Sequence, residues 1–133
     1  MFSDEIDTGM SGFKFDPSKP GLRKTLRGYE ELALRYVWSV GEPGAGSGII
    51  WKNVNEQLGP EESISRASII IIMNRLVDQG VLGYREGTGK GGHHKIYVPL
   101  MDEKGYVKYL LKTMVESMIK DFPEETREVL EEY

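Results

Sequence analysis

The feature that most constrains the fold of this chain is a helical segment followed at once by two β-rich runs around a glycine-rich turn. Ser63 or Ser65 can accept hydrogen bonds from the free amides of a first helical turn, and Gly80 suits the left-handed position that closes a helix. The β-branched run at 69–72 is compatible with a strand, but these flanking signals favour a helix. Its buried stripe is predicted to consist of Ile69, Met73, Leu76 and Val77.

The two β-rich runs cover residues 81–86 and 93–99, and glycine dominates residues 87–92 between them. This pattern predicts a β-hairpin with an adaptable tip. The tip contains Gly-Lys, but Gly91 follows Lys90 where a phosphate-binding P-loop needs Ser or Thr and then a helix. We therefore do not expect a nucleotide site here.

Two further helices are predicted upstream, at 29–40 and 47–58, from apolar residues at helical spacing. Ser47 is expected to cap the second of them. Residues 41–48 contain four glycines and a proline and are expected to form a loop. We expect both tryptophans of the chain, Trp38 and Trp51, to lie in the core.

The order of these elements, three helices and then a two-stranded ribbon, is that of a winged helix-turn-helix domain, which we place at residues 28–101. The expected fold class is mainly α with a small β-hairpin. Residues 1–27 are expected to form an irregular, basic N-terminal arm, and residues 102–133 a C-terminal helical segment. Asp102 is expected to cap a long helix in this segment, whose apolar stripe pairs two protomers because it must be buried somewhere.

The charge of the chain is unevenly distributed. There are 17 Lys and Arg against 21 Asp and Glu, so the net charge is −4. Residues 14–27 nevertheless hold five basic side chains against one acidic, and residues 63–98 hold five against two, whereas residues 102–133 hold five against nine. Because salt limits electrostatic reach to about 8 Å, the local field and not the net charge attracts a polyanion.

Several classes of function find no support in the sequence. The absence of cysteine excludes a disulfide scaffold, a thiol nucleophile and a thiolate zinc site. No catalytic spacing of Ser, His and Asp appears, so we expect neither an enzyme nor a cofactor. His93 and His94 are adjacent on a predicted strand and point to opposite faces, which argues against a metal pair. No apolar run spans a bilayer and no signal-peptide pattern opens the sequence, so we expect a cytoplasmic protein without membrane contact.

The third helix and the hairpin carry the residues suited to DNA. The major groove is about 12 Å wide and admits one helix, whose amino-terminal end can approach phosphates when its side chains are small and polar. The tetrapeptide Ser65-Arg66-Ala67-Ser68 meets this requirement. The hairpin would hold flanking phosphates or a minor groove through Arg85, Lys90, His93, His94 and Lys95.

Three stretches, at 31–42, 65–82 and 97–100, resemble the penicillinase-repressor family of the BlaI, MecI and CopY types. The resemblance covers roughly residues 29–118 and implies a homodimeric repressor that binds double-stranded operator DNA, with the C-terminal helices forming the dimer. The DNA-reading positions that it implies are Arg66, Ala67, Ser68, Ile70 and Ile71.

The sequence departs from this family in ways that leave alternatives open. Ile70 and Ile71 stand where the family has polar residues, so they either contact thymine methyl groups or are buried. Arg75 either contacts DNA or forms an ion pair with an acidic residue. The apolar pair and the net negative charge also fit a winged-helix module that binds protein in a transcription or chromosome-partition complex. The sequence identifies no operator and no inducer.

Overall fold

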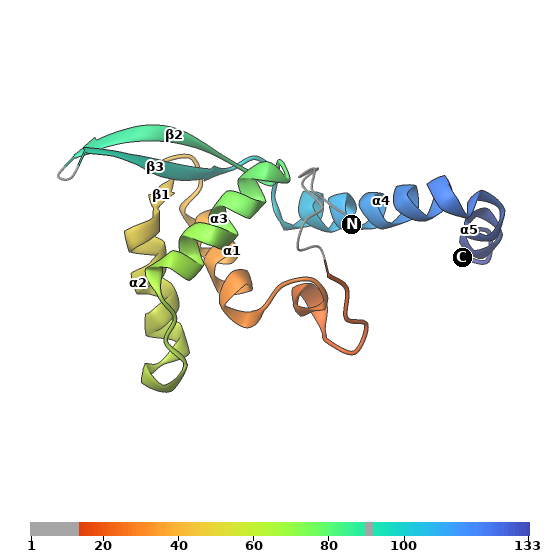
Figure 1. Cartoon of the computed structure of the whole chain (residues 1–133), viewed down its shortest axis with the longest axis horizontal. Helices are drawn as coiled ribbons and strands as arrows, with labels where there is room; N and C mark the ends of the chain where they lie inside the picture. The colour runs from red at the N-terminus through yellow and green to blue at the C-terminus, as the bar shows by residue number, and fades with distance from the viewer. Residues whose placement is uncertain (1–13, 90–91) are drawn as a thin grey trace, which may run out of the picture. The chain divides into compact units, whose positions relative to one another are not determined.

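A computed structural model describes residues 14–89 and 92–133, and of Gly89, Gly92 and His93 it describes only the backbone (Figure 1). The architecture is mainly helical with one small antiparallel sheet, which confirms the predicted fold class of a winged helix domain with C-terminal helices. The chain divides into two compact units, with the boundary between Leu100 and Met101. Residues 1–13 of the predicted arm and Lys90 at the predicted hairpin tip lie outside the described residues.

The core of the first unit is built from three helices: α1 (Gly28–Val40), α2 (Ser47–Leu58) and α3 (Arg66–Asp78). On α3 the side chains of Ile69, Ile72, Met73 and Leu76 are at most 1% exposed. The predicted stripe was wrong at one position, because Val77 is half-buried and Ile72 takes its place. A helix with 3.6 residues per turn brings positions i, i+3, i+4 and i+7 to one face, and this favours Ile72.

The position of Trp51 also corrects the sequence interpretation. Its side chain is 37% exposed, while Ile50 and Val54 supply the buried face of α2. The indole Nε1 of Trp51 donates to the carbonyl oxygen of Ile64 at 2.9 Å. Trp51 thus fastens the short 3₁₀ connection η2 (Pro60–Glu62) and its following residues to α2. Trp38, on α1, is half-buried.

The sheet has the strand order β1-β3-β2 and is antiparallel throughout. Strands β2 (Leu82–Gly89) and β3 (Gly92–Pro99) form a long ribbon that projects beyond the helices (Figure 1). Residues 87–89 and Gly92 belong to the strands, so the hairpin is longer than the sequence indicated. The turn between the strands lies outside the described residues.

The predicted loop at 41–48 contains a strand, β1 (Ala45–Gly46), in which Ala45 pairs with Tyr97. Gly44 makes this approach feasible: its φ is +76°, and a Cβ there would lie 2.8 Å from the carbonyl oxygen of Tyr97. The expectation that Ser47 caps α2 was also wrong. Ser47 is the first helical residue, and Gly46 occupies the cap position without a side-chain hydrogen bond.

Residues 14–27, the described part of the arm, contain the 3₁₀ helix η1 (Gly21–Lys24). The side chains of Leu22 and Leu26 are each 5% exposed and belong to the core. Backbone hydrogen bonds close the segment on itself, from Asp16 N to Lys24 O and from Lys19 N to Asp16 O.

The second unit consists of α4 (Glu103–Asp121) and α5 (Pro123–Leu130). The carboxylate of Asp102 accepts from Gly105 N at 2.8 Å, which confirms Asp102 as the cap of α4. Phe122 separates the two helices, and Pro123 suits the first position of α5 because that position needs no amide hydrogen. No helix in the described part of the chain has the length and apolar character of a membrane span.

Candidate nucleic-acid interface

The amino-terminal end of α3 is open to solvent. Ser65 caps the helix, since its Oγ accepts from Ser68 N at 3.1 Å, and this settles the choice between Ser63 and Ser65. Ser65, Arg66 and Ala67 are exposed, and the first turn of α3 contains no acidic residue. The free amides of Arg66 and Ala67 and the positive end of the helix dipole therefore point outward, an arrangement that favours an anion.

Arg66 lies across the start of α2. Its Nε donates to Ser47 Oγ at 3.2 Å, and a Cβ on Gly48 would come 3.4 Å from its Nη2. The contact brings the amino-terminal ends of α2 and α3 together, with a guanidinium group between them. Glu61 and Glu62 precede α3 in the chain, but no carboxylate of residues 14–89 or 92–133 forms an ion pair with Arg66.

Two isoleucines extend this surface along α3. Ile70 is 38% exposed and Ile71 is 65% exposed. Burial, one of the two alternatives that the sequence left open for this pair, therefore does not occur within the described structure. Both side chains lie on the same helix as Arg66 and face solvent.

Two basic residues of the ribbon are bound internally. Arg85 donates through Nη2 to the carbonyl oxygen of Pro43 at 2.7 Å and through Nη1 to that of Glu42 at 3.4 Å. The Nζ of Lys95 lies 3.2 Å from Asn74 Oδ1 and 4.6 Å from the ring centre of Tyr84. These contacts fix the base of the ribbon against α3 and against the loop that leaves α1.

The outer part of the ribbon carries the remaining predicted residues. His94 is exposed and pairs in register with Gly87, while His93 pairs with Thr88. The side chain of His93 and all of Lys90 lie outside the described residues. Within the described part of the chain, no three His, Asp or Glu side chains gather as metal ligands.

Arg75 lies toward the other end of α3, nine residues from Arg66, which is about 14 Å along the helix axis. Its Nη2 is 3.2 Å from Oε2 of Glu30, so the ion-pair alternative is the one the structure contains. Glu30 is only 4% exposed, and its Oε1 also accepts from Arg27 N at 2.8 Å. The guanidinium of Arg75 therefore balances a buried carboxylate.

Sequence reasoning missed two residues that organise this surface. Ser47 orients Arg66 from 19 positions away, and Asn74 receives both Lys95 Nζ and the Tyr97 hydroxyl, the latter at 2.9 Å. Burial raises the pKa of the Tyr97 phenol, and the nearby Tyr84 acts in the same direction. The phenol thus remains a neutral hydrogen-bond donor that holds β3 to α3.

The sequence model described as Penicillinase repressor matches residues 29–132, which include all of α2 to α5 and all but the first residue of α1. No curated protein matches the chain. The described arm, residues 14–27, lies outside the matched range.

Proposed function

The chain belongs to the penicillinase repressor family of DNA-binding transcriptional regulators, and from this premise we propose that it is a dimeric repressor that reads an inverted-repeat operator with the amino-terminal end of α3. The observation that carries this proposal is the exposed start of α3, where Arg66 lies between two helix ends. The free amides at the start of α3 and one guanidinium suit a DNA phosphate or the edge of a guanine.

The residues at the start of α3 have distinct roles in this proposal. Ser65 and Ser68 allow the helix to come close to the backbone, and Ala67 leaves space for a base edge. Ile70 and Ile71 neither donate nor accept hydrogen bonds, so they contact thymine methyl groups. Arg75 is not part of the reading surface because it balances Glu30.

In the ribbon, His94 together with Lys90 and His93 contacts the flanking phosphates. Arg85 and Lys95 act as positioning residues, because their internal hydrogen bonds fix the direction in which the ribbon projects.

The second unit supplies the dimer contact in this proposal. The helices α4 and α5 enclose an apolar groove of about 500 Å³, lined mainly by Met114, Val115, Met118, Phe122, Val129 and Leu130. Members of this family bind DNA as dimers, and a second copy of the same helix pair is apolar enough to cover the groove. A two-fold contact predicts operator half-sites in inverted orientation, about one helical turn or a multiple apart.

A charge placed in the groove tests the dimer. Val129→Asp is expected to raise the dimer dissociation constant at least a hundredfold, by roughly 3 kcal/mol, because a carboxylate would be buried without a partner. Sedimentation equilibrium measures this directly, with Tyr133→Asp, at a position that is 97% exposed, as the matched control. If both variants remain dimers, the groove is not the contact.

Selection of bound sequences from random duplexes tests the proposed reading mode. The full chain is expected to enrich inverted repeats with thymine at positions that face Ile70 and Ile71. Enrichment of single, unrepeated sites would contradict the dimeric arrangement. Enrichment that persists unchanged in an Arg66→Ala, Lys90→Ala double variant would contradict the assignment of α3 and the ribbon.

A second candidate function rests on the same isoleucines. Exposed apolar side chains at the start of α3, in a chain of net charge −4, also suit docking onto another protein. The two functions differ in their salt dependence: DNA binding weakens steeply with added salt because counterions are released, whereas an isoleucine-based contact barely responds.

A further inference from the structure

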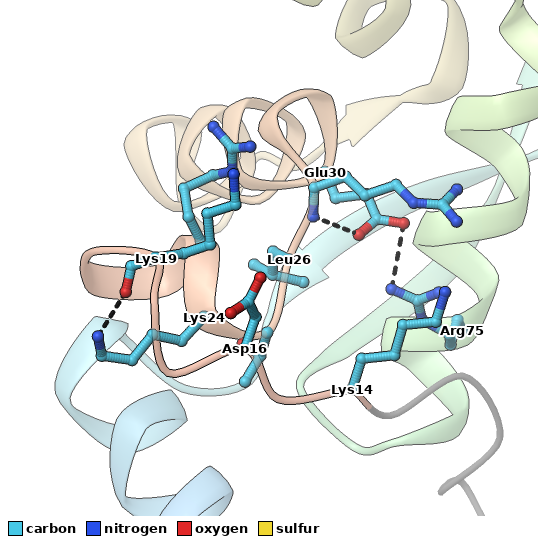
Figure 2. A pocket seen from close by; sticks show the side chains of 10 residues that line it. Lys14, Asp16, Lys19, Lys24, Leu26, Glu30 and Arg75 are labelled. Carbon is cyan, nitrogen blue, oxygen red and sulfur yellow. Dashed lines mark hydrogen bonds and ion pairs between the residues drawn. The ribbon is translucent and has the colours of Figure 1, made fainter.

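A cavity of about 200 Å³ lies at the carboxyl-terminal end of α3, between residues 14–27 and the start of α1 (Figure 2). Its volume corresponds to roughly seven water molecules in the liquid, at ~30 Å³ each. Figure 2 labels lining residues of the arm, namely Lys14, Asp16, Lys19, Lys24 and Leu26, together with Glu30 and Arg75.

The lining of this cavity is strongly basic. It contains six cationic side chains and two carboxylates, and the cationic ones are Lys14, Lys19, Arg23, Lys24, Arg27 and Arg75. The carboxylates are already engaged: Glu30 accepts from Arg75 and from Arg27 N, and Asp16 accepts from Ser18 N at 3.0 Å and Ser18 Oγ at 2.6 Å. The hydrogen bonds from Ser18 hold the pKa of Asp16 below its ordinary value. The cavity therefore keeps an excess of positive charge over its own carboxylates.

The arm holds these cations in place before any ligand arrives. Leu22 and Leu26 anchor it in the core, and the backbone bond from Asp16 N to Lys24 O, 2.7 Å long, closes the loop that carries Lys19 and Arg23. The Nζ of Lys24 donates to the carbonyl oxygen of Lys19. A Cβ on Gly28, the first residue of α1, would lie 3.5 Å from Arg23 Nη1, so this guanidinium lies against the start of that helix.

We propose that this cavity is an effector site for a compact polyanion, such as a small phosphorylated or polycarboxylate metabolite. Cavities for drug-sized ligands measure about 300–1,000 Å³, so a volume of 200 Å³ selects a small, highly charged molecule. Guanidinium groups bind phosphate and carboxylate groups in bidentate fashion, and Arg23, Arg27 and Arg75 line the same space.

DNA is the less suitable occupant of this cavity. Arg75 lies about 14 Å along α3 from the end that we propose for the major groove. An anion bound here would compete with Glu30 for Arg75, which lies on α3. An effect of the bound anion on DNA affinity would require that the proposed function is correct. Binding of the anion itself does not depend on the proposed function.

Titration calorimetry of the full chain with sodium pyrophosphate tests the site, at constant ionic strength and with sodium acetate as the reference. One pyrophosphate per chain is expected to bind. Lys19→Gln and Arg23→Gln are each expected to weaken it about tenfold, because each removes a charge-assisted contact. Both residues are exposed, so the variants are expected to fold normally. Lys104→Gln and Lys112→Gln on α4 make the same change of charge and serve as controls.

The outcomes separate this proposal from the proposed function. Absence of pyrophosphate binding, or equal weakening by the α4 controls, overturns the effector site whether or not the chain binds DNA. If the Lys19→Gln, Arg23→Gln double variant instead loses as much affinity for the selected duplex as Arg66→Gln does, the cavity is a DNA contact and the proposal fails. Selective loss of pyrophosphate binding with unchanged duplex affinity supports it.

Discussion

The two ends of α3 each carry an arginine, and the fold uses the two residues differently. Arg66 is exposed and contacts a hydroxyl group, that of Ser47, so its charge is available to an external anion. Arg75 is 25% exposed and contacts the buried carboxylate of Glu30. The difference shows that the charge of Arg66 is directly available to an external anion, whereas an anion that binds Arg75 must compete with Glu30.

The same contrast separates the two parts of the ribbon. At its base, Asn74 accepts from Lys95 and Tyr97 and joins β3 to α3. Farther out, His94 is exposed. The contacts of Asn74 thus serve stability at the base of the ribbon, whereas the amino-terminal end of α3 and the outer ribbon are the parts that we propose for recognition.

The largest expected effect comes from breaking the ion pair between Arg75 and Glu30 near the carboxyl-terminal end of α3. Glu30→Gln is expected to lower the free energy of unfolding by about 2 kcal/mol, because it leaves the Arg75 guanidinium half-buried without a carboxylate. Urea denaturation measures the loss. Glu31→Gln is the matched control, since Glu31 forms a surface pair with Arg35 at 2.8 Å that is worth only about 0.5 kcal/mol. Equal losses in both variants would contradict the distinction.

An intermediate effect on stability is expected at the amino-terminal end of α3. Ser65→Ala removes the side chain that accepts from Ser68 N and should lower the free energy of unfolding by about 1 kcal/mol. Thermal unfolding followed by circular dichroism provides the measurement. Ser63→Ala, two residues earlier and exposed, should change stability by less than about 0.5 kcal/mol. A larger loss for Ser63→Ala would place the cap elsewhere.

The smallest effect concerns the contact between the ribbon and α3. Tyr97→Phe removes one donor to Asn74 and is expected to lower stability by about 0.5–1 kcal/mol at pH 8. Because burial raises the pKa of Tyr97 above 10, the unfolded chain loses the phenolic proton first as the pH rises, so the native protein loses stability above about pH 10. Below that pH both states keep the proton and the contribution is constant.

Urea titrations between pH 8 and pH 11 measure this dependence. Tyr97→Phe should show a weaker decline of stability above pH 10 than the native chain. Tyr133→Phe, at a fully accessible position, should follow the native curve. If Tyr97→Phe also declines with the native slope, Tyr97 does not have the raised pKa.

Local sequence signals predicted α3, the helix that we propose for DNA recognition. Capping by Ser63 or Ser65 and closure at Gly80, whose φ is +80°, were predicted from residues at the two ends of the helix, whereas the exposure of Ile70 and Ile71 was left open. The two β-rich runs around the glycine-rich stretch predicted the ribbon, and Asp102 predicted the start of the first C-terminal helix. These features could be predicted because they depend on hydrogen bonds and on periodic spacing among residues that are close in the sequence.

Contacts between distant residues escaped prediction. β1 has only two residues, too few to show alternation, and its pairing with β3 joins positions 50 and 52 residues apart. The partners of Arg66 and Arg75 likewise lie on other helices, at Ser47 and Glu30. Leu22 and Leu26 are isolated apolar residues in a basic segment rich in proline and glycine, so their burial left no periodic signal.

Duplex affinity measured as a function of potassium chloride concentration tests the central claim most directly. The operator obtained by selection is titrated with the native chain, with Arg66→Gln, and with the Glu30→Gln, Arg75→Gln double variant. The double variant neutralises both members of the ion pair near the carboxyl-terminal end of α3. We predict a steep decrease of log affinity with log salt for the native chain, and a slope smaller by about one, with roughly tenfold weaker binding, for Arg66→Gln alone. Two results would contradict the assignment of the amino-terminal end of α3 to DNA. One is an affinity of the native chain that does not change with salt concentration, and the other is a smaller slope for the double variant but not for Arg66→Gln.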